Sequence, residues 1–400
     1  MTDSAAEHGR VIALLSLAAF ASAASMRACD ALLPVLVRGF GVTTHQAART
    51  VSVFALAYGV TQMLYGPLGD RYGKLRVIAI AASAGVATSV GAMLAPGIGW
   101  LIGFRAIGGA AAAAIIPLSM AWIGDQIAYE HRQATLARFL MGQMLGIISG
   151  QVLGGVFADY LGWRWTFGFL AVTYLAAAAA LWAQSDAFGA TTADAQADFA
   201  SSVVAIAQGG WPRTILATVF FEGVAVFGAL AFIPWHLHHR FGVSLTLAGL
   251  APGAFGLGGL CYAMFTRRLL ARLGEQGLVR LGAASLVTAL AGLAAGGNWQ
   301  LAVPESALLG FGYYMLHNTL QTNATQMAPA NRGAAMSLFA SCFFVGQSTG
   351  VSIASAMIDS IGTTPMFVGA ALVLITLAVS FAVALSRRPA SARRTPEEAG

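Results

Sequence analysis

Four ionisable residues lie inside long apolar stretches of this sequence, where a charge is costly: Arg27, Asp30, Arg105 and Glu222. Ionisable groups at such positions are candidates for binding and moving a proton or an ion. Burial disfavours an ionised carboxylate, so Asp30 and Glu222 could each take up a proton when buried and release it when exposed. We therefore predict proton coupling at these four residues, with the two carboxylates as the carriers.

Simpler structural roles are the alternatives for the same residues. Arg27 and Asp30 are three residues apart, so they would share one helical face and could form a static ion pair that fixes packing. Glu222 has no basic residue within one helical turn, so we expect it to be unpartnered, or else protonated and hydrogen-bonded to a neighbouring helix. Arg105 is expected at a similar height to Arg27 and Asp30, which predicts one buried cluster of these three.

Uncharged polar residues also recur at helical spacing within apolar segments. The stripes are formed by Tyr58, Gln62, Tyr314, His317, Asn318 and Gln321. Side chains three and four residues apart share a helical face, as the lining of a cavity for a small molecule would. Hydrogen bonding between neighbouring helices is the other interpretation.

The overall composition indicates which elements must position these residues. Of 400 residues, 58% are hydrophobic and 10% are charged, against about 25% charged in a soluble domain. Soluble, disordered and fibrous classes are therefore excluded, and a polytopic membrane protein is indicated. The net charge of +6 reflects membrane topology rather than binding to nucleic acid.

A spanning helix needs about 20 largely apolar residues, and twelve segments qualify: 11–37, 47–68, 75–95, 99–122, 136–158, 165–184, 214–236, 246–267, 278–296, 300–326, 333–357 and 364–386. The predicted fold is an all-α membrane protein with twelve transmembrane helices in two pseudo-symmetric six-helix bundles. Its parts are an N-terminal bundle at 1–184, a cytoplasmic central linker at 185–212, a C-terminal bundle at 213–386 and a basic cytoplasmic tail at 387–400.

The basic residues predict the orientation of these spans. With both termini in the cytoplasm, sixteen of the 22 lysines and arginines are cytoplasmic, four are outside and two lie within spans. Basic residues favour the cytoplasmic side of a membrane. We therefore expect a multi-pass protein of the cell inner (plasma) membrane with both termini cytoplasmic.

The two halves of the sequence also resemble each other at a nearly fixed offset. Gly109 corresponds to Gly310 at an offset of 201, and Asp159 to Asp359 at an offset of 200. Gly142-Gln143 reappears as Gly346-Gln347 at an offset of 204. Two parallel repeats predict a substrate site at their interface and alternating access by rocking of one half on the other.

One loop carries a specific motif. The run Gly66-Pro67-Leu68-Gly69-Asp70-Arg71-Tyr72-Gly73-Lys74-Leu75-Arg76 follows the second span and resembles the loop signature of the major facilitator superfamily. Gly66 is expected to let helices pack closely, and Asp70 could form a charge relay with Arg71 and Arg76. The resemblance implies a conformational switch that locks the outward-open state, formed by Gly66, Asp70, Arg71, Gly73, Lys74 and Arg76. A plain basic anchor at the membrane surface is the alternative.

Other segments are similar to twelve-helix drug:proton antiporters within that superfamily. They are residues 30–34 (Asp-Ala-Leu-Leu-Pro), the segment that begins at Arg105, and Gly162-Trp163-Arg164-Trp165. Gln151 stands where the antiporter signature has a proline. The resemblance implies that Arg105 assists proton transfer, whereas Gln151 departs from the exporter pattern.

The function expected from these features is secondary active transport, by proton-coupled efflux (antiport) of small lipophilic or drug-like molecules. A proton-coupled symporter or facilitator of a small polar metabolite is the alternative. Neither a nucleophile with a base nor metal-ligand spacing is evident, so we expect no enzyme, cofactor or metal site, and His236, His238 and His239 are read as solvated loop residues. The expected partners are a small-molecule substrate, protons and the lipid bilayer, with a monomeric chain and no nucleic acid.

Overall fold

The computed structural model describes residues 2–184, 199–328 and 331–387, and every regular element among them is a helix. The first half contains α1 (Thr2–Arg27), α2 (Leu33–Phe40), α3 (Thr44–Tyr72), α4 (Lys74–Met93), α5 (Ile98–Ala112), α6 (Ile115–Gln126), α7 (Tyr129–Tyr160) and α8 (Arg164–Trp182). The second half contains α9 (Phe199–Gln208), α10 (Gly210–Glu222), the π-helical turn η2 (Gly223–Phe227), α11 (Gly228–Leu230), α12 (Ile233–Phe241), α13 (Leu245–Ala295), η3 (Trp299–Leu301), α14 (Ala302–Ala324), α15 (Arg332–Ile361) and α16 (Thr363–Ser386).

These helices form the predicted twelve crossings. Within the described residues, ten helical stretches are long and apolar enough to span a membrane. One of them, the 51-residue α13, contains two spans, because its backbone reverses at Gly274, where φ is 61°. The 23-residue α14 supplies the remaining crossing. The prediction of an all-α fold is confirmed.

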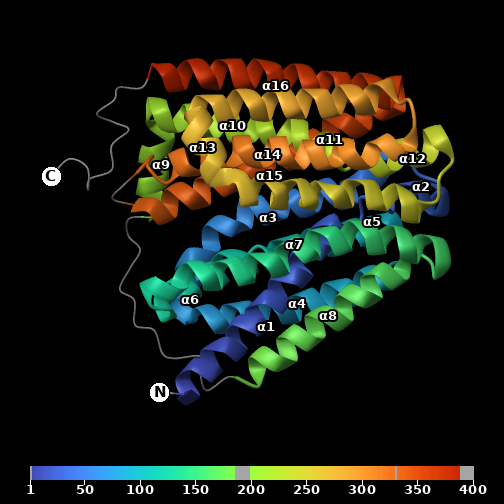
Figure 1. Ribbon diagram of the computed structural model, residues 1–400. Helices are drawn as coiled ribbons and strands as arrows, with labels where there is room; N and C mark the ends of the chain where they lie inside the picture. Colours follow the sequence, from blue (N-terminus) through green and yellow to red (C-terminus); the bar gives the residue numbers. More distant parts are fainter. Residues whose placement is uncertain (1, 185–198, 329–330, 388–400) are drawn as a thin grey trace.

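The helices gather into two bundles that lie side by side (Figure 1). We call α1–α8 the N bundle and α10–α16 the C bundle. We call the end of the molecule where α1 begins and α16 ends the terminal end, and the opposite end, where α2 and α12 lie, the distal end. The bundles meet where α3 packs along α15 and α7 packs along α13.

Three of the predicted spans are interrupted rather than continuous. Turns at 28–32 separate α1 from α2, turns at 113–114 separate α5 from α6, and η2 with a turn at 231–232 divides the span that begins with α10. Pro34 begins α2 and Pro234 begins α12, each in the first two positions of its helix. Proline suits a helix start because it lacks the N–H that would be unpaired there. The continuous helices expected over 11–37, 99–122 and 214–236 were therefore wrong.

Packing contacts repeat in the two bundles. The backbone of Gly146 on α7 packs against the carbonyl of Phe20 on α1, and Gly346 on α15 packs against the carbonyl of Phe220 on α10. Such close approach requires residues without a side chain. The equivalent of Gly346 is thus Gly146 at an offset of 200, and the alignment of Gly346 with Gly142 was wrong.

The segment expected to be a linker includes a helix. Residues 185–198 lie outside the described residues, but 199–208 form α9, which packs on α10 and α15. Ile206 of α9 is buried against Ala334 and Ala335. The basic tail expected at 387–400 lies outside the described residues except for Arg387.

Candidate functional site

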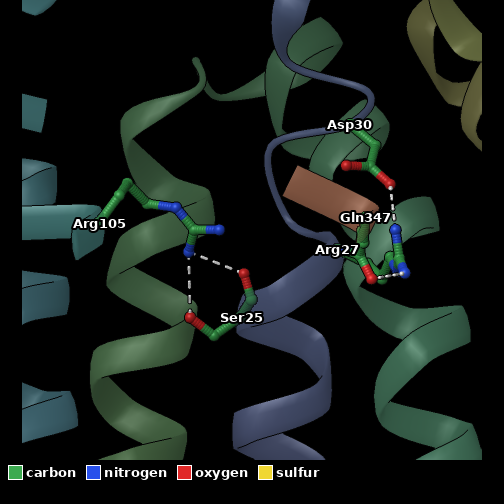
Figure 2. Close-up of polar contacts among 5 residues, drawn as sticks. All are labelled: Ser25, Arg27, Asp30, Arg105 and Gln347. Atoms are coloured by element: carbon green, nitrogen blue, oxygen red, sulfur yellow. Dashed lines mark hydrogen bonds and ion pairs between the residues drawn. The ribbon is translucent and has the colours of Figure 1, made fainter. Parts of the chain in front are cut away.

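The break between α1 and α2 places a buried ion pair at the contact between the bundles (Figure 2). Arg27 is the last residue of α1, and Asp30 lies in the turn that follows, where its N–H donates to the Arg27 carbonyl at 3.2 Å. Arg27 Nη1 lies 3.5 Å from Asp30 Oδ2, and the two side chains are 2% and 0% exposed. The predicted pairing exists, but the two residues do not share a helical face as expected, because the helix ends between them.

Arg27 also reaches across to the C bundle. Its Nη2 donates to Gln347 Oε1 on α15 at 3.3 Å, and its guanidinium lies 4.4 Å from the ring centroid of Phe227 in η2. Gln347 is itself fully buried. A single guanidinium is therefore shared between a carboxylate of the N bundle and two side chains of the C bundle.

Arg105 makes its direct contacts elsewhere and forms no hydrogen bond or ion pair with Arg27 or Asp30 among the described residues. Its Nε donates to the Thr50 carbonyl at 2.9 Å, and its Nη1 donates to the Ser25 carbonyl at 2.8 Å and to Ser25 Oγ at 3.2 Å. The guanidinium also stacks 4.0 Å from the ring centroid of Phe54. In Figure 2, Arg105 lies on the other side of α1 from Asp30. Its contacts join α5 to α1 and α3, and a part in proton transfer stays a prediction.

Glu222 has a partner that the local sequence does not reveal. His317 Nδ1 of α14 lies 2.7 Å from Glu222 Oε2, and their side chains are 14% and 0% exposed. The expectation of an unpartnered carboxyl was wrong, because the partner is 95 residues away in the chain. Aromatic rings surround the histidine, with Tyr313 stacked on it at 4.9 Å and Phe343 at 5.0 Å between ring centroids. This second acid–base pair lies within the C bundle.

The π-helical turn η2 connects the two pairs. It begins immediately after Glu222 and ends at Phe227, the ring beneath Arg27. A π-helical turn inside an α-helix widens the backbone and often marks a functional position. A change at either pair would therefore act on the same short segment of the C bundle.

The other predicted cavity residues differ in their exposure. Tyr58 is buried at the bundle interface, where its ring centroid lies 4.4 Å from that of Phe344. Gln62, Tyr314 and Asn318 are half-buried, whereas Gln321 is exposed. A cavity of about 460 Å³ lies elsewhere, between α13 and α16, and is lined by apolar residues with Arg280 and Ser386. The substrate role of the predicted residues stays a prediction.

The motif after α3 forms an ion-pair cluster at the terminal end, but with different partners from those expected. Lys74 Nζ lies 2.8 Å from Asp70 Oδ1 and 2.9 Å from Asp125 Oδ2, which joins the ends of α3 and α6 to the start of α4. Arg71 stacks over Tyr72 instead, at 5.2 Å from its ring centroid, and Arg76 is exposed. The relay through Arg71 and Arg76 was therefore wrong, and Asp125 was missed.

The glycines of this motif also differ in role. Gly73 has a φ of 90°, which allows the tight reversal between α3 and α4. A methyl group added at Gly66 would meet open space, whereas one at Gly69 would meet the Leu118 side chain. Close packing therefore depends on Gly69, and the expectation for Gly66 was wrong.

The three histidines after η2 lie on a helix rather than in a loop. His236 is 1% exposed, and its Nδ1 lies 2.6 Å from Thr363 Oγ1. His238 and His239 follow it on the same short helix, α12, with Nδ1 atoms near backbone carbonyls. The expectation of a loop was wrong, because this segment continues as helix to Phe241, and the expectation of solvation was wrong for the buried His236, whereas His239 is exposed.

Sequence reasoning missed Gln347 as a site residue. The alignment of Gln347 with Gln143 was no guide to it, because at the corrected offset of 200 the equivalent residue is Ile147. A fully buried amide within an apolar span is the property that would have drawn attention to it.

Comparison with known proteins identifies the family. Residues 15–332 and 306–400 match the model of the Major Facilitator Superfamily. The chloramphenicol resistance protein of Pseudomonas aeruginosa is 29% identical over 152 residues, which are 38% of this chain and 36% of that protein. The efflux pump FUBT of Fusarium oxysporum is 27% identical over 169 residues, or 41% of this chain and 28% of the pump. The matched segments span 26–40% of the length of the first curated relatives.

Solved structures share the fold over nearly the whole chain. A bacterial homologue of the human lysosomal transporter Spinster, in an inward-facing and occupied conformation, has a TM-score of 0.76 at 17% identity, covering 97% of this chain and 99% of that one. The nucleoside transporter NupG has a TM-score of 0.76 at 12% identity, covering 92% of this chain and 98% of its own. Members of the superfamily are multi-pass membrane transporters of small molecules. The twelve crossings, the repeated packing contacts and the family match together establish that this chain belongs to the major facilitator superfamily.

Proposed function

We propose that this transporter is a proton-coupled exporter (antiporter) of small lipophilic or drug-like molecules. The observation that carries the proposal is the position of Arg27, which is shared between Asp30 of the N bundle and Gln347 of the C bundle. A proton on Asp30 would remove the negative charge that holds Arg27 to its own bundle. Proton binding would then change how strongly the two bundles are joined, and this is the link that coupling requires.

The Glu222–His317 pair is proposed as a second proton-binding site. A carboxylate and an imidazole 2.7 Å apart can exchange a proton directly. Glu222 Oε1 has no hydrogen-bond partner among the described residues, so it is free to bind a further donor. Because η2 runs from Glu222 to Phe227, the protonation of this pair is proposed to act on Arg27 through that turn.

The orientation follows from the basic residues. We propose that the terminal end faces the cytoplasm and that the protein lies in the cell inner membrane with both termini cytoplasmic, since sixteen of its 22 lysines and arginines then lie on that side. The bundle boundaries near 1–184 and 213–386 and a monomeric state belong to the same proposal.

A lipophilic substrate is supported by the aromatic surroundings of the site and by the names of two relatives. The rings of Tyr58, Phe227, Phe343 and Phe344 lie at or beside the bundle interface. One relative is named a chloramphenicol resistance protein and another is named an efflux pump. A proton-coupled symporter or facilitator of a polar metabolite is the second candidate, favoured by the buried amides of Gln151 and Gln347, which a polar ligand could use.

Transport in proteoliposomes tests the proposal. Purified protein is reconstituted, a pH gradient is imposed, and radiolabelled chloramphenicol and a panel of lipophilic cationic dyes and polar metabolites are screened. An exporter moves its substrate in the direction opposite to the proton flow. It also protects an efflux-deficient host during growth in the same compounds. Accumulation in the same direction as the protons, without protection, would instead establish the symporter. If the rate of transport does not depend on the pH gradient for any substrate, proton coupling is refuted.

A further inference from the structure

At the distal end, two carboxylates each accept hydrogen bonds from the opposite bundle. Asp159, near the end of α7, accepts hydrogen bonds from the N–H groups of Leu245 and Thr246 at 3.2 and 2.8 Å and from Thr246 Oγ1 at 2.7 Å. Asp359, near the end of α15, accepts from the N–H groups of Thr44 and His45 at 3.2 and 2.9 Å. Each carboxylate therefore binds both N–H groups that begin the opposite helix.

The two contacts are related by the internal repeat and point in opposite directions. Asp159 belongs to the N bundle and binds the first residues of α13 in the C bundle. Asp359 belongs to the C bundle and binds the first residues of α3 in the N bundle. Acceptor and donor positions each recur at an offset of 200 or 201. The pattern therefore belongs to the repeat and joins the bundles twice in the same way.

Neither helix needs the carboxylate in order to begin. Thr43 already caps α3 by accepting from the N–H of Gln46, and Ser244 caps α13 by accepting from the N–H of Leu247. The N–H groups bound by the aspartates are additional ones, which at a helix start have no acceptor in their own helix. A negative charge is also favoured at the positive end of the helix dipole. The energy of these contacts is thus available for holding one bundle against the other.

The backbones around the contacts approach closely. Gly155, one turn before Asp159, packs against the carbonyl of Leu245, with no space for a side chain. On the other side, His45 Nδ1 lies 3.0 Å from Ser355 Oγ, one turn before Asp359. Both helix pairs are therefore closed at the distal end, and separating them would break every one of these hydrogen bonds.

We propose that Asp159 and Asp359 are a symmetric pair of latches that hold the distal end closed, and that both must release when the transporter opens toward that side. In alternating access the bundles rock about a central site, so α7 leaves α13 and α3 leaves α15 in the same movement. The proposal concerns the closed state of the distal end and holds whether or not transport is coupled to protons.

The test measures how far the distal ends of the two bundles separate. Spin labels are attached at Trp100→Cys and Leu301→Cys, exposed distal positions on different bundles with 63% and 51% exposure. The native cysteines Cys29, Cys261 and Cys342 are replaced by serine. Distance distributions in lipid nanodiscs are recorded by double electron–electron resonance. The two single variants Asp159→Asn and Asp359→Asn and the double variant are compared with the parent.

Each single variant is expected to raise the ratio of open to closed distal ends about threefold, and the double variant about tenfold, the range of a helix-capping contact at a partly exposed site. Thr246→Pro removes two of the donors while keeping Asp159, and proline is tolerated in the first turn of a helix. Thr246→Pro should raise the ratio of open to closed distal ends by the amount expected for Asp159→Asn. It therefore tests the proposal even if Asp159→Asn folds poorly.

Matched controls separate a latch from a general effect. Glu305→Gln neutralises a half-buried carboxylate near the start of α14, at the same end of the molecule, and should leave the distribution unchanged. A label pair within the N bundle, Trp100→Cys with Leu161→Cys, should keep its distance in every variant. An unchanged 100–301 distribution in the folded double variant and in Thr246→Pro would overturn the proposal, as would an equal shift in Glu305→Gln.

Discussion

The hydrogen bond between Arg27 and Gln347 leads to a prediction with a defined sign. Gln347→Leu removes the acceptor for Arg27 Nη2 at 3.3 Å and replaces it with an apolar side chain of similar size. In the wild type, protonation of Asp30 leaves Arg27 bound to Gln347. In the variant, protonation of Asp30 leaves a buried guanidinium without that acceptor, so the ionised carboxylate is favoured.

The size of the effect follows from the geometry. A hydrogen bond to a charged group contributes about 1.5–3 kcal/mol, and the long 3.3 Å separation places this one at the lower end. Only the extra strength that this bond gains when Asp30 is protonated shifts the titration, so its full value is an upper limit. Because about 1.4 kcal/mol corresponds to one pH unit, the pH at which transport is half-maximal should move to the acid side by up to about one unit. Gln347→Glu provides an anion for Arg27 and repels ionised Asp30, so it should move that pH to the alkaline side.

The assay is the initial rate of transport in proteoliposomes as a function of pH at both faces, for the wild type and the two variants. A residue that merely supports packing would lower the rate in both variants and leave the midpoint where it is. Midpoints that stay within about 0.3 pH unit of the wild type, or that move in the same direction, would refute the sharing of Arg27 between the bundles.

Two further predictions concern stability, and both are read from melting temperatures of the purified protein. Gly346→Ala places a methyl group against the carbonyl of Phe220 and should destabilise the folded protein by more than about 2 kcal/mol. Gly66→Ala, whose methyl group meets open space, should be neutral or slightly stabilising. Equal melting temperatures of the two variants would contradict the packing described. Lys74→Met removes ion pairs to Asp70 and Asp125, whose side chains are 46% and 54% exposed, so the loss should stay at or below about 1 kcal/mol and should shrink in high salt. A large loss that is independent of salt would show that the cluster acts by other means.

The spans could be predicted from the sequence because lipid leaves the backbone few choices. A segment that crosses a bilayer must satisfy its own hydrogen bonds, so about 20 apolar residues are enough to predict a helix. The interruptions near Asp30 and within the span that begins with α10 were not predicted, because the residues at the breaks, Asp30 excepted, are as apolar as the helices around them. Pro34 and Pro234, at equivalent positions, were the available signal.

Individual residues of the candidate site could be predicted from the sequence, but the contacts between them could not. The cost of burying charge was enough to select Arg27, Asp30 and Glu222 from the sequence. Their partners were not predictable, because Gln347 is 320 residues from Arg27 and lies on a helix whose rotation against α1 is set by packing. For the same reason, the pairing of Glu222 with His317 was not predictable. The internal repeat located Asp159 and Asp359 as equivalent positions, but only the contacts between helices reveal what they bind.

The central claim, that a proton on Asp30 drives transport, is tested most directly by comparing two modes of transport in Asp30→Asn. This variant resembles a permanently protonated carboxyl of nearly the same shape. Accumulation driven by a pH gradient should be lost, while exchange of labelled for unlabelled substrate without a gradient should continue at a rate within a few-fold of the wild type. Gradient-driven accumulation at the wild-type level in Asp30→Asn would contradict the claim.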